Sequence, residues 1–352
     1  MSLSSGAAPV APSSYSRLML RRVTALSVGL VLLVLCVLVD ILTGPALLPM
    51  GDTVAALFGL ERASSMTNVI VWDIRLPMSL MAITVGAALA ISGVIMQTIL
   101  GNPLASPYTL GFSAAAGFGA AVVILTGFTL PILAWLTVPV SAFGATLVSA
   151  ALVYGLSRAR GMTPEEMLLA GIATLFLFQS LQSMVQYMAS PEVLQAIVFW
   201  LFGSLLKASW DNLPVTFAIL VFCVAAILPD LWRLTALRMG DERAAAVGVN
   251  VTCLRVRMFV IVALLTAGAV AFVGTIGFVG LVAPHIARGF VGEEQRALLP
   301  MAALTGAIVM TGASILSKLI SPGSGIPIGI VTAVRGVPLL FGLIVMGKRR
   351  YW

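Results

Sequence analysis

The sequence predicts an all-α polytopic membrane protein with about ten transmembrane helices, and three observations lead to this prediction. Of the 352 residues, 60% are hydrophobic and 9% are charged, whereas soluble domains have about 45–50% apolar and about 25% charged residues. The mean hydropathy is +1.09. The apolar runs are long and continuous, not segments of about 10 residues with alternating polarity, which favours helical spans over transmembrane strands.

Net charge and cysteine content exclude several soluble classes of protein. The net charge is +7, but the basic residues are scattered between apolar segments and form no basic patch of the kind that binds nucleic acid. Cys36, Cys223 and Cys253 lie far apart, and His285 is the one histidine of the chain. Neither a disulfide framework nor a metal site is therefore expected.

The N-terminal segment predicts a tail followed by the first span. Residues 1–16 are small and polar and are expected to form a disordered cytoplasmic tail, followed by a single transmembrane domain over residues 17–350. The apolar run 23–42 is longer than the core of about 7–15 residues that a cleavable signal peptide has. It is therefore the first span.

The most informative stretch is residues 76–157, which contain 82 residues and no Asp, Glu, Lys or Arg. At about 20 residues for each crossing, it holds three spans. Proline- and glycine-containing segments at 101–107 and 127–131 mark the joints. Three crossings put Arg75 and Arg158 on opposite sides of the membrane.

The second half supplies the remaining spans. Residues 230–257 carry eight charges and are expected to be a cytoplasmic loop, and an amphipathic stretch around Trp200 to Trp210 lies between the expected spans 167–191 and 212–229. The run 258–287 is too long for one crossing and is read as a seventh span with a short, bent eighth. The other expected spans are 167–191, 212–229, 297–317 and 326–347.

The distribution of basic residues predicts the orientation. Cytoplasmic loops of membrane proteins carry an excess of Lys and Arg, and placing both termini in the cytoplasm of a bacterial inner membrane divides the 20 basic residues 15 to 5. The five on the other side or within spans are Arg62, Arg75, Lys207, Lys318 and Arg335.

A weak internal similarity suggests five plus five helices in an inverted repeat. Gly86 to Gly93 resembles Gly268 to Gly274, and Pro103 and Pro284 each follow ten residues after the last glycine. The alternative is a chance match, because glycine- and alanine-rich runs resemble one another easily.

The chain lacks the residues that its own energy source or catalysis would need. No lysine is followed by Ser or Thr, so there is no P-loop for ATP. Proton-coupled carriers place acids within their spans, and here Asp40 is the nearest to such a position. His285 has no evident catalytic partner and is expected to be structural. These absences leave a passive pathway whose energy comes from another subunit.

Several motifs, in order along residues 20–350, resemble the FecCD-type permeases of bacterial ABC importers for iron-siderophores, haem and cobalamin. They are Arg75 to Pro77, Val85 to Gly93, Gln97, Asn102 to Pro107, Leu168 to Gly171, Gly240 to Val249, Gly277 to His285, and Ile326 to Ala333. The resemblance implies a type II importer permease that binds no cofactor itself. It pairs with a second permease subunit, identical or different, with two ATPase subunits that bind ATP and Mg²⁺, and with a substrate-binding protein.

In this family the loop after the sixth helix forms short coupling helices that contact the ATPase. The matching residues are Gly240, Asp241, Glu242, Arg243, Ala244, Ala245 and Gly248. A merely solvated connector is the alternative.

Two further residue sets follow from the resemblance. Arg75 and Lys318 match basic positions that dock the binding protein through its carboxylates, although Met78 replaces a second arginine, and interfacial snorkelling is the alternative. Asn102 and Leu104 match one part of the cytoplasmic gate. Pro164 and Glu165 match the other part, where Glu165 instead suits a helix N-terminus electrostatically.

Arg335 departs from the apolar residue usual in the tenth helix of the family. A charge within a span is costly and marks a functional position, so we expect Arg335 to face the pathway or the partner permease and to favour an anionic ferric siderophore. Pairing with a carbonyl or with an acid of a neighbouring subunit is the alternative. Haem or cobalamin import, and a secondary transporter working alone, are the competing functions.

Overall fold

The computed structural model describes residues 14–44, 48–60, 64–320 and 326–346, and these form helices and loops without strands. The α-helices are α1 (Ser14–Leu42), α2 (Met50–Leu57), α3 (Ser65–Val69), α4 (Leu76–Ile99), α5 (Phe112–Thr126), α6 (Thr137–Arg158), α7 (Pro164–Met188), α8 (Pro191–Leu201), α9 (Leu213–Ile227), α10 (Leu231–Leu237), α11 (Asp241–Ala246), α12 (Val251–Val273), α13 (Val279–Val291), α14 (Gln295–Ile320) and α15 (Ile328–Met346). A π-helical turn, η1 (Ile70–Arg75), joins α3 to α4, and 3-10 turns are η2 (Ala134–Leu136), η3 (Leu205–Lys207) and η4 (Leu228–Asp230).

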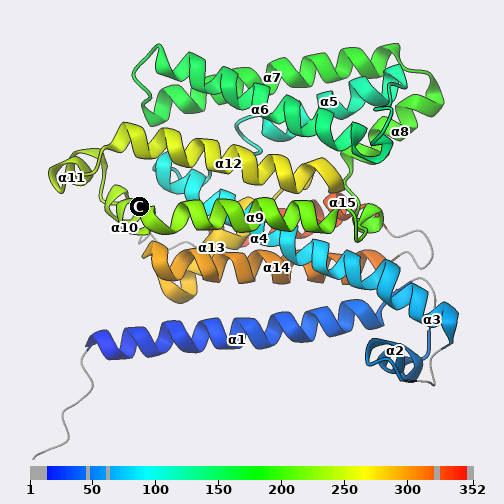
Figure 1. Cartoon of the computed structure of the whole chain (residues 1–352). Coiled ribbons are helices and arrows are strands. Elements are labelled where there is room, and N and C mark those ends of the chain that lie inside the picture. Colours follow the sequence, from blue (N-terminus) through cyan, green and yellow to red (C-terminus); the bar gives the residue numbers. More distant parts are fainter. Residues whose placement is uncertain (1–13, 45–47, 61–63, 321–325, 347–352) are drawn as a thin grey trace, which may run out of the picture.

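The long helices run side by side in a bundle (Figure 1). We call one end of the bundle the α11 end, where α10, α11 and the start of α1 lie, and the other the α2 end, where α2, α3 and α8 lie. In this view α1 forms one side, α5 to α8 form the opposite side, and α4, α12, α13 and α14 lie between them.

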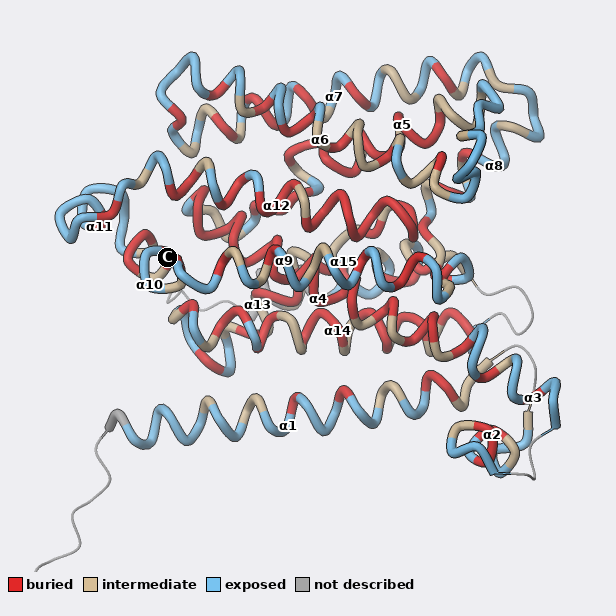
Figure 2. The backbone as a smooth tube through the Cα atoms, in the orientation of Figure 1, coloured by how far each residue is buried: buried red, intermediate tan, exposed pale blue. Residues whose placement is uncertain are grey.

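The centre of the bundle is α4, which contacts α9, α12, α13 and α14. Nearly all of its residues are buried (Figure 2). Small residues permit this close packing, as is usual between helices in a membrane. A Cβ atom on Gly93 would overlap the carbonyl oxygen of Gly280 in α13. Gly86 similarly meets Gly306 of α14.

The outer helices expose apolar side chains. Leu30 in α1, Phe176 in α7 and Phe222 in α9 are each more than half exposed. Such continuous apolar surfaces are rare on soluble monomers, and a helix surrounded by lipid requires them. Seven helical segments within the described ranges are long and apolar enough to cross a membrane: Ser16–Leu42, Ser65–Ile99, Ala134–Arg158, Pro164–Met188, Leu213–Leu237, Val251–Val273 and Gln295–Ile320.

The prediction of a polytopic α-helical protein with about ten spans is confirmed. The seven long segments together with α5, α13 and α15 occupy the ten predicted positions. The pair α12 and α13 divides the run 258–287, and α13 is only 13 residues long with Pro284 inside it. The five-plus-five repeat stays a prediction.

Several segment boundaries differ from the predicted ones, and two of these differences lie in segments that were predicted to be outside the membrane. Within the predicted loop 230–257, α12 already begins at Val251, because the Asn250 side chain accepts a hydrogen bond from the Cys253 amide at 3.0 Å and caps the helix. Of the predicted tail 1–16, residues 1–13 lie outside the described part of the chain, and α1 begins at Ser14.

Candidate functional site

A buried ion pair lies at the α2 end. Lys318 Nζ donates to Asp40 Oδ1 at 2.8 Å and to the Asp40 carbonyl oxygen at 3.0 Å. The Ser79 hydroxyl donates to the second Asp40 carboxylate oxygen. Asp40 is fully buried and Lys318 is 7% exposed, so the pair links the end of α1 to α14 inside the bundle.

Arg75 lies beside this pair and binds the last turn of α1. Its Nη1 donates to the carbonyl oxygens of Ile41 at 2.8 Å and Leu42 at 3.2 Å. The last carbonyls of a helix have no partner within the helix, and a cation there also interacts favourably with the helix dipole. Arg75 therefore fixes the C-terminal end of α1 against α4.

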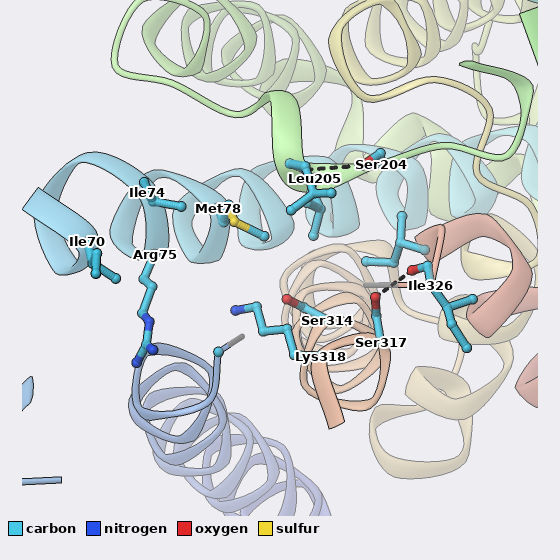
Figure 3. Close-up of a pocket in the computed structure, with 13 residues that line it drawn as sticks. Ile70, Ile74, Arg75, Met78, Ser204, Leu205, Ser314, Ser317, Lys318 and Ile326 are labelled. Carbon is cyan, nitrogen blue, oxygen red and sulfur yellow. Dashed lines mark hydrogen bonds between the residues drawn. The ribbon is translucent and has the colours of Figure 1, made fainter. Parts of the chain in front are cut away.

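A cavity of about 290 Å³ opens next to these two basic residues (Figure 3). Its wall is largely apolar, with Arg75, Lys318 and three serines as the polar contribution. In Figure 3, Arg75 extends from the start of α4 toward α1, and the hydroxyl group of Ser314 lies near the Lys318 side chain. The lining residues are Gly44, Ile70, Ile74, Arg75, Met78, Ser204, Leu205, Leu206, Ser314, Ser317, Lys318, Ile326 and Ile328.

Arg75 and Lys318, predicted to dock a binding protein, are thus brought to one place but not to the surface. Arg75 is 2% exposed, and its guanidinium is bound to main-chain carbonyls. Lys318 is paired with Asp40. Neither side chain is available to a protein partner in this conformation. The docking role of these two residues therefore stays a prediction.

At the α11 end, Arg255 of α12 is a buried charge that is 4% exposed. Its Nη2 donates to both carboxylate oxygens of Asp241 at 2.9 Å. Its Nε donates to the Ile99 carbonyl at 2.9 Å, and its Nη1 donates to the Met162 carbonyl at 3.1 Å. One side chain thereby contacts the end of α4, the segment before α7, and α11.

The segment predicted to couple to an ATPase projects from the α11 end of the bundle (Figure 1). Asp241, Glu242, Arg243, Ala245 and Gly248 are exposed, whereas Ala244 is buried. Gly240 starts α11 with a φ of 101° and a ψ of 157°, a backbone conformation that is essentially restricted to glycine. This residue sets the direction in which α11 leaves α10.

The predicted gate residues occupy two loops at the same end. Asn102 Oδ1 accepts a hydrogen bond from the Leu104 amide at 2.9 Å and closes a turn, which leaves Leu104 61% exposed. Pro164 is the first residue of α7, whose amide end is capped by the Thr163 hydroxyl. Glu165 lies exposed in the first turn, where a carboxylate suits the helix dipole.

Arg335 lies apart from both groups, as the eighth residue of α15. It is exposed, and no acidic side chain among the described residues forms an ion pair with it. It borders a cavity of about 300 Å³ between α13, α14 and α15, lined by Phe278, Val279, Val282, Val309, Ala313, Thr332, Arg335 and Gly336.

Two residues of these groups were not predicted as site residues. Asp40 is noted in the sequence only as an acid near a span, and Arg255 only as a basic residue on the cytoplasmic side. The sequence does contain a signal for Arg255, which is an arginine near the start of an apolar helix, because such a side chain requires hydrogen-bond acceptors when it is buried. Which acceptors it has depends on the loops that lie nearby. Within the described ranges, no group of three or more His, Cys, Asp or Glu side chains could hold a metal ion.

Comparison with known proteins gives consistent matches over nearly the whole chain. A profile of the FecCD transport family matches residues 32–346. The chain is 37% identical to the hemin transport system permease protein of Yersinia pestis, over 81% of this chain and 86% of that protein. It is 34% identical to the Fe(3+)-citrate import system permease protein of Bacillus subtilis, over 94% of this chain and 97% of that protein.

The fold is similar to a solved structure. That structure, an inward-facing ABC transporter assigned to the metal-chelate type, superposes with a TM-score of 0.80 at 32% sequence identity. The match covers 91% of this chain and 98% of the solved chain.

Proposed function

The chain belongs to the FecCD transport family, and from this premise we propose that it is the transmembrane permease subunit of an ATP-driven importer of a ferric siderophore. The observation that carries the proposal is the family match over residues 32–346. The permease performs no covalent chemistry. It provides a pathway that opens alternately to the two sides of the membrane.

The partners follow from this role. A second permease subunit completes the pathway, two ATPase subunits bind ATP and Mg²⁺, and a periplasmic or lipid-anchored binding protein delivers the cargo. In the proposed complex α11 and its flanking glycines contact an ATPase subunit. Exposed charged side chains on α11 support this role, because Asp241, Glu242 and Arg243 can form polar contacts with a partner in water.

The proposed orientation places the α11 end in the cytoplasm. Support comes from the basic residues on the helices at that end. Arg238 follows α10, Arg243 lies in α11, Arg255 and Arg257 lie in the first turns of α12, and Arg288 shares Glu293 with Arg238. Segments that remain on the cytoplasmic side of a membrane carry such an excess. The loops that hold Asn102, Leu104, Pro164 and Glu165 then form the cytoplasmic gate, and the docking role of Arg75 and Lys318 stays a prediction for another conformation.

The preference for an anionic chelate is supported by Arg335. A charged side chain at a helix centre in lipid costs about 3 kcal/mol, so an exposed arginine on α15 must face protein or water and not acyl chains. With no acidic partner in the described part of the chain, its charge is available to a ligand in the pathway or to the partner permease. An anionic ferric siderophore fits this charge.

Replacing Arg335 by glutamine is expected to lower uptake of anionic ferric siderophores by about tenfold or more, while a neutral chelate is less affected. A loss of about 1.4 kcal/mol of favourable charge interaction corresponds to a factor of ten. Uptake of radiolabelled anionic and neutral ferric chelates, haem and cobalamin into proteoliposomes with the complete transporter measures the effect. If the complete transporter takes up haem or cobalamin and no ferric siderophore, the proposed substrate is wrong.

The control for this substitution is Arg296→Gln, which removes an exposed arginine at the α11 end of α14. Arg335→Lys keeps the charge and is expected to retain most of the anion uptake. If Arg335→Gln leaves uptake of every chelate unchanged, Arg335 has no role in the pathway.

A further inference from the structure

The side chain of Arg255 connects three segments that are distant in sequence. The side chain is only 4% exposed. Each of its three nitrogens donates to a different segment: Nε to α4, Nη1 to the segment before α7, and Nη2 to α11. A guanidinium group is planar and presents its donors in a fixed fork. A shift of one acceptor group therefore requires the other two to move with it or to lose their hydrogen bonds.

Two of the acceptors are main-chain carbonyls at the ends of the two gate loops. Ile99 is the last residue of α4 and immediately precedes the turn that contains Asn102 and Leu104. Met162 has a φ of 60°, rare for a residue other than glycine, and precedes the Thr163 cap and Pro164. Arg255 thus fixes both loops at the points where they join their helices.

The third acceptor is the carboxylate of Asp241, the first residue of α11. One nitrogen, Nη2, lies 2.9 Å from both carboxylate oxygens, and a hydrogen bond between two ionised groups is stronger than one between neutral groups. Asp241 is half exposed, with 50% of its side chain accessible, whereas Arg255 is buried. The contact therefore joins a residue on the exposed helix to one inside the bundle.

We propose that Arg255 is a positioning residue that transmits movements of α11 to the two gate loops. This inference rests on the proposed function, in which α11 contacts an ATPase subunit. When α11 shifts, the two-bond contact with Asp241 carries the guanidinium with it, and the Ile99 and Met162 carbonyls must follow or lose their donor. Arg255 touches no substrate and acts only through these segments.

The test is the ratio of cargo imported to ATP hydrolysed by the complete complex in proteoliposomes. Arg255→Lys keeps the charge, but lysine has one nitrogen in place of the three separate nitrogens that reach Asp241, the Ile99 carbonyl and the Met162 carbonyl. We expect the ratio to fall by about tenfold or more, within the range of couplings between sites, while ATP hydrolysis continues. The matched control is Arg257→Lys, two residues along α12, which pairs instead with Asp230 and Ala226.

A second variant keeps the test decisive if Arg255→Lys does not assemble. Asp241→Asn changes a half-exposed side chain, retains its size, and removes the carboxylate that Arg255 binds. It should lower the same ratio, and the double variant should be no worse than the stronger single variant, because contacting residues are not additive. The amount of ATPase subunit that copurifies reports whether docking is intact.

Specific results would overturn the proposal. They are an unchanged ratio in both single variants, a proportional fall of uptake and hydrolysis, or additive effects in the double variant. A wild-type complex without ATP-dependent uptake would instead reject the proposed function, which keeps the two failures distinguishable.

Discussion

Replacing Asp40 by alanine is expected to destabilise the folded chain by about 3–5 kcal/mol, the cost typical of breaking a buried ion pair from one side. The substitution leaves the Lys318 ammonium group, 7% exposed, without the carboxylate that it binds at 2.8 Å. It also removes the acceptor of the Ser79 hydroxyl. Thermal unfolding of the purified protein in detergent measures the loss.

The double variant Asp40→Ala with Lys318→Met should recover much of this stability, because the unpaired charge is then absent. Asp73→Ala is the matched control, since Asp73 lies exposed at the same end of the bundle. Equal stability of the Asp40 single variant and the control would show that the pair contributes nothing.

Replacing Gly93 by alanine is expected to cost about 3 kcal/mol, at the upper end of the usual range for an overfilled core. The new Cβ atom would overlap the main-chain oxygen of Gly280, and a backbone atom cannot rotate away as a side chain can. The helices α4 and α13 must then separate near the centre of the bundle. The midpoint of thermal unfolding of the Gly93→Ala variant, measured in detergent as for the Asp40 variants, reports this effect.

The matched control is Gly144→Ala in α6, where a Cβ atom meets nothing within 4 Å. Alanine is favoured over glycine within a helix by up to about 1 kcal/mol, so this variant should be neutral or slightly more stable. An unaltered midpoint for Gly93→Ala would contradict the close packing of α4 and α13.

The spans could be predicted from the sequence because each depends on a local property, the length of an apolar run. The charge-free residues 76–157 became α4, α5 and α6, joined at the predicted turns. The start of α12 at Val251 was harder to place, since Arg255 and Arg257 suggest a loop when the contacts that satisfy them are unknown. The Asn250 cap is the local signal for that start.

The arrangement of the site could be predicted only in part, because it depends on contacts between distant segments. The motifs locate α11 and the two gate loops along the chain, but they do not say that Arg255 joins all three. Similarly, the residue types of Arg75 and Lys318 suit binding to a carboxylate. The sequence does not tell that the carboxylate and carbonyls come from α1 of the same chain.

The measurement that tests the central claim most directly is cargo uptake into proteoliposomes with and without internal ATP. One set contains this chain with its copurifying subunits and binding protein, and the other contains this chain alone. We predict uptake only in the complete set and only with ATP. Uptake by the single polypeptide without ATP would contradict an importer permease and identify a secondary transporter.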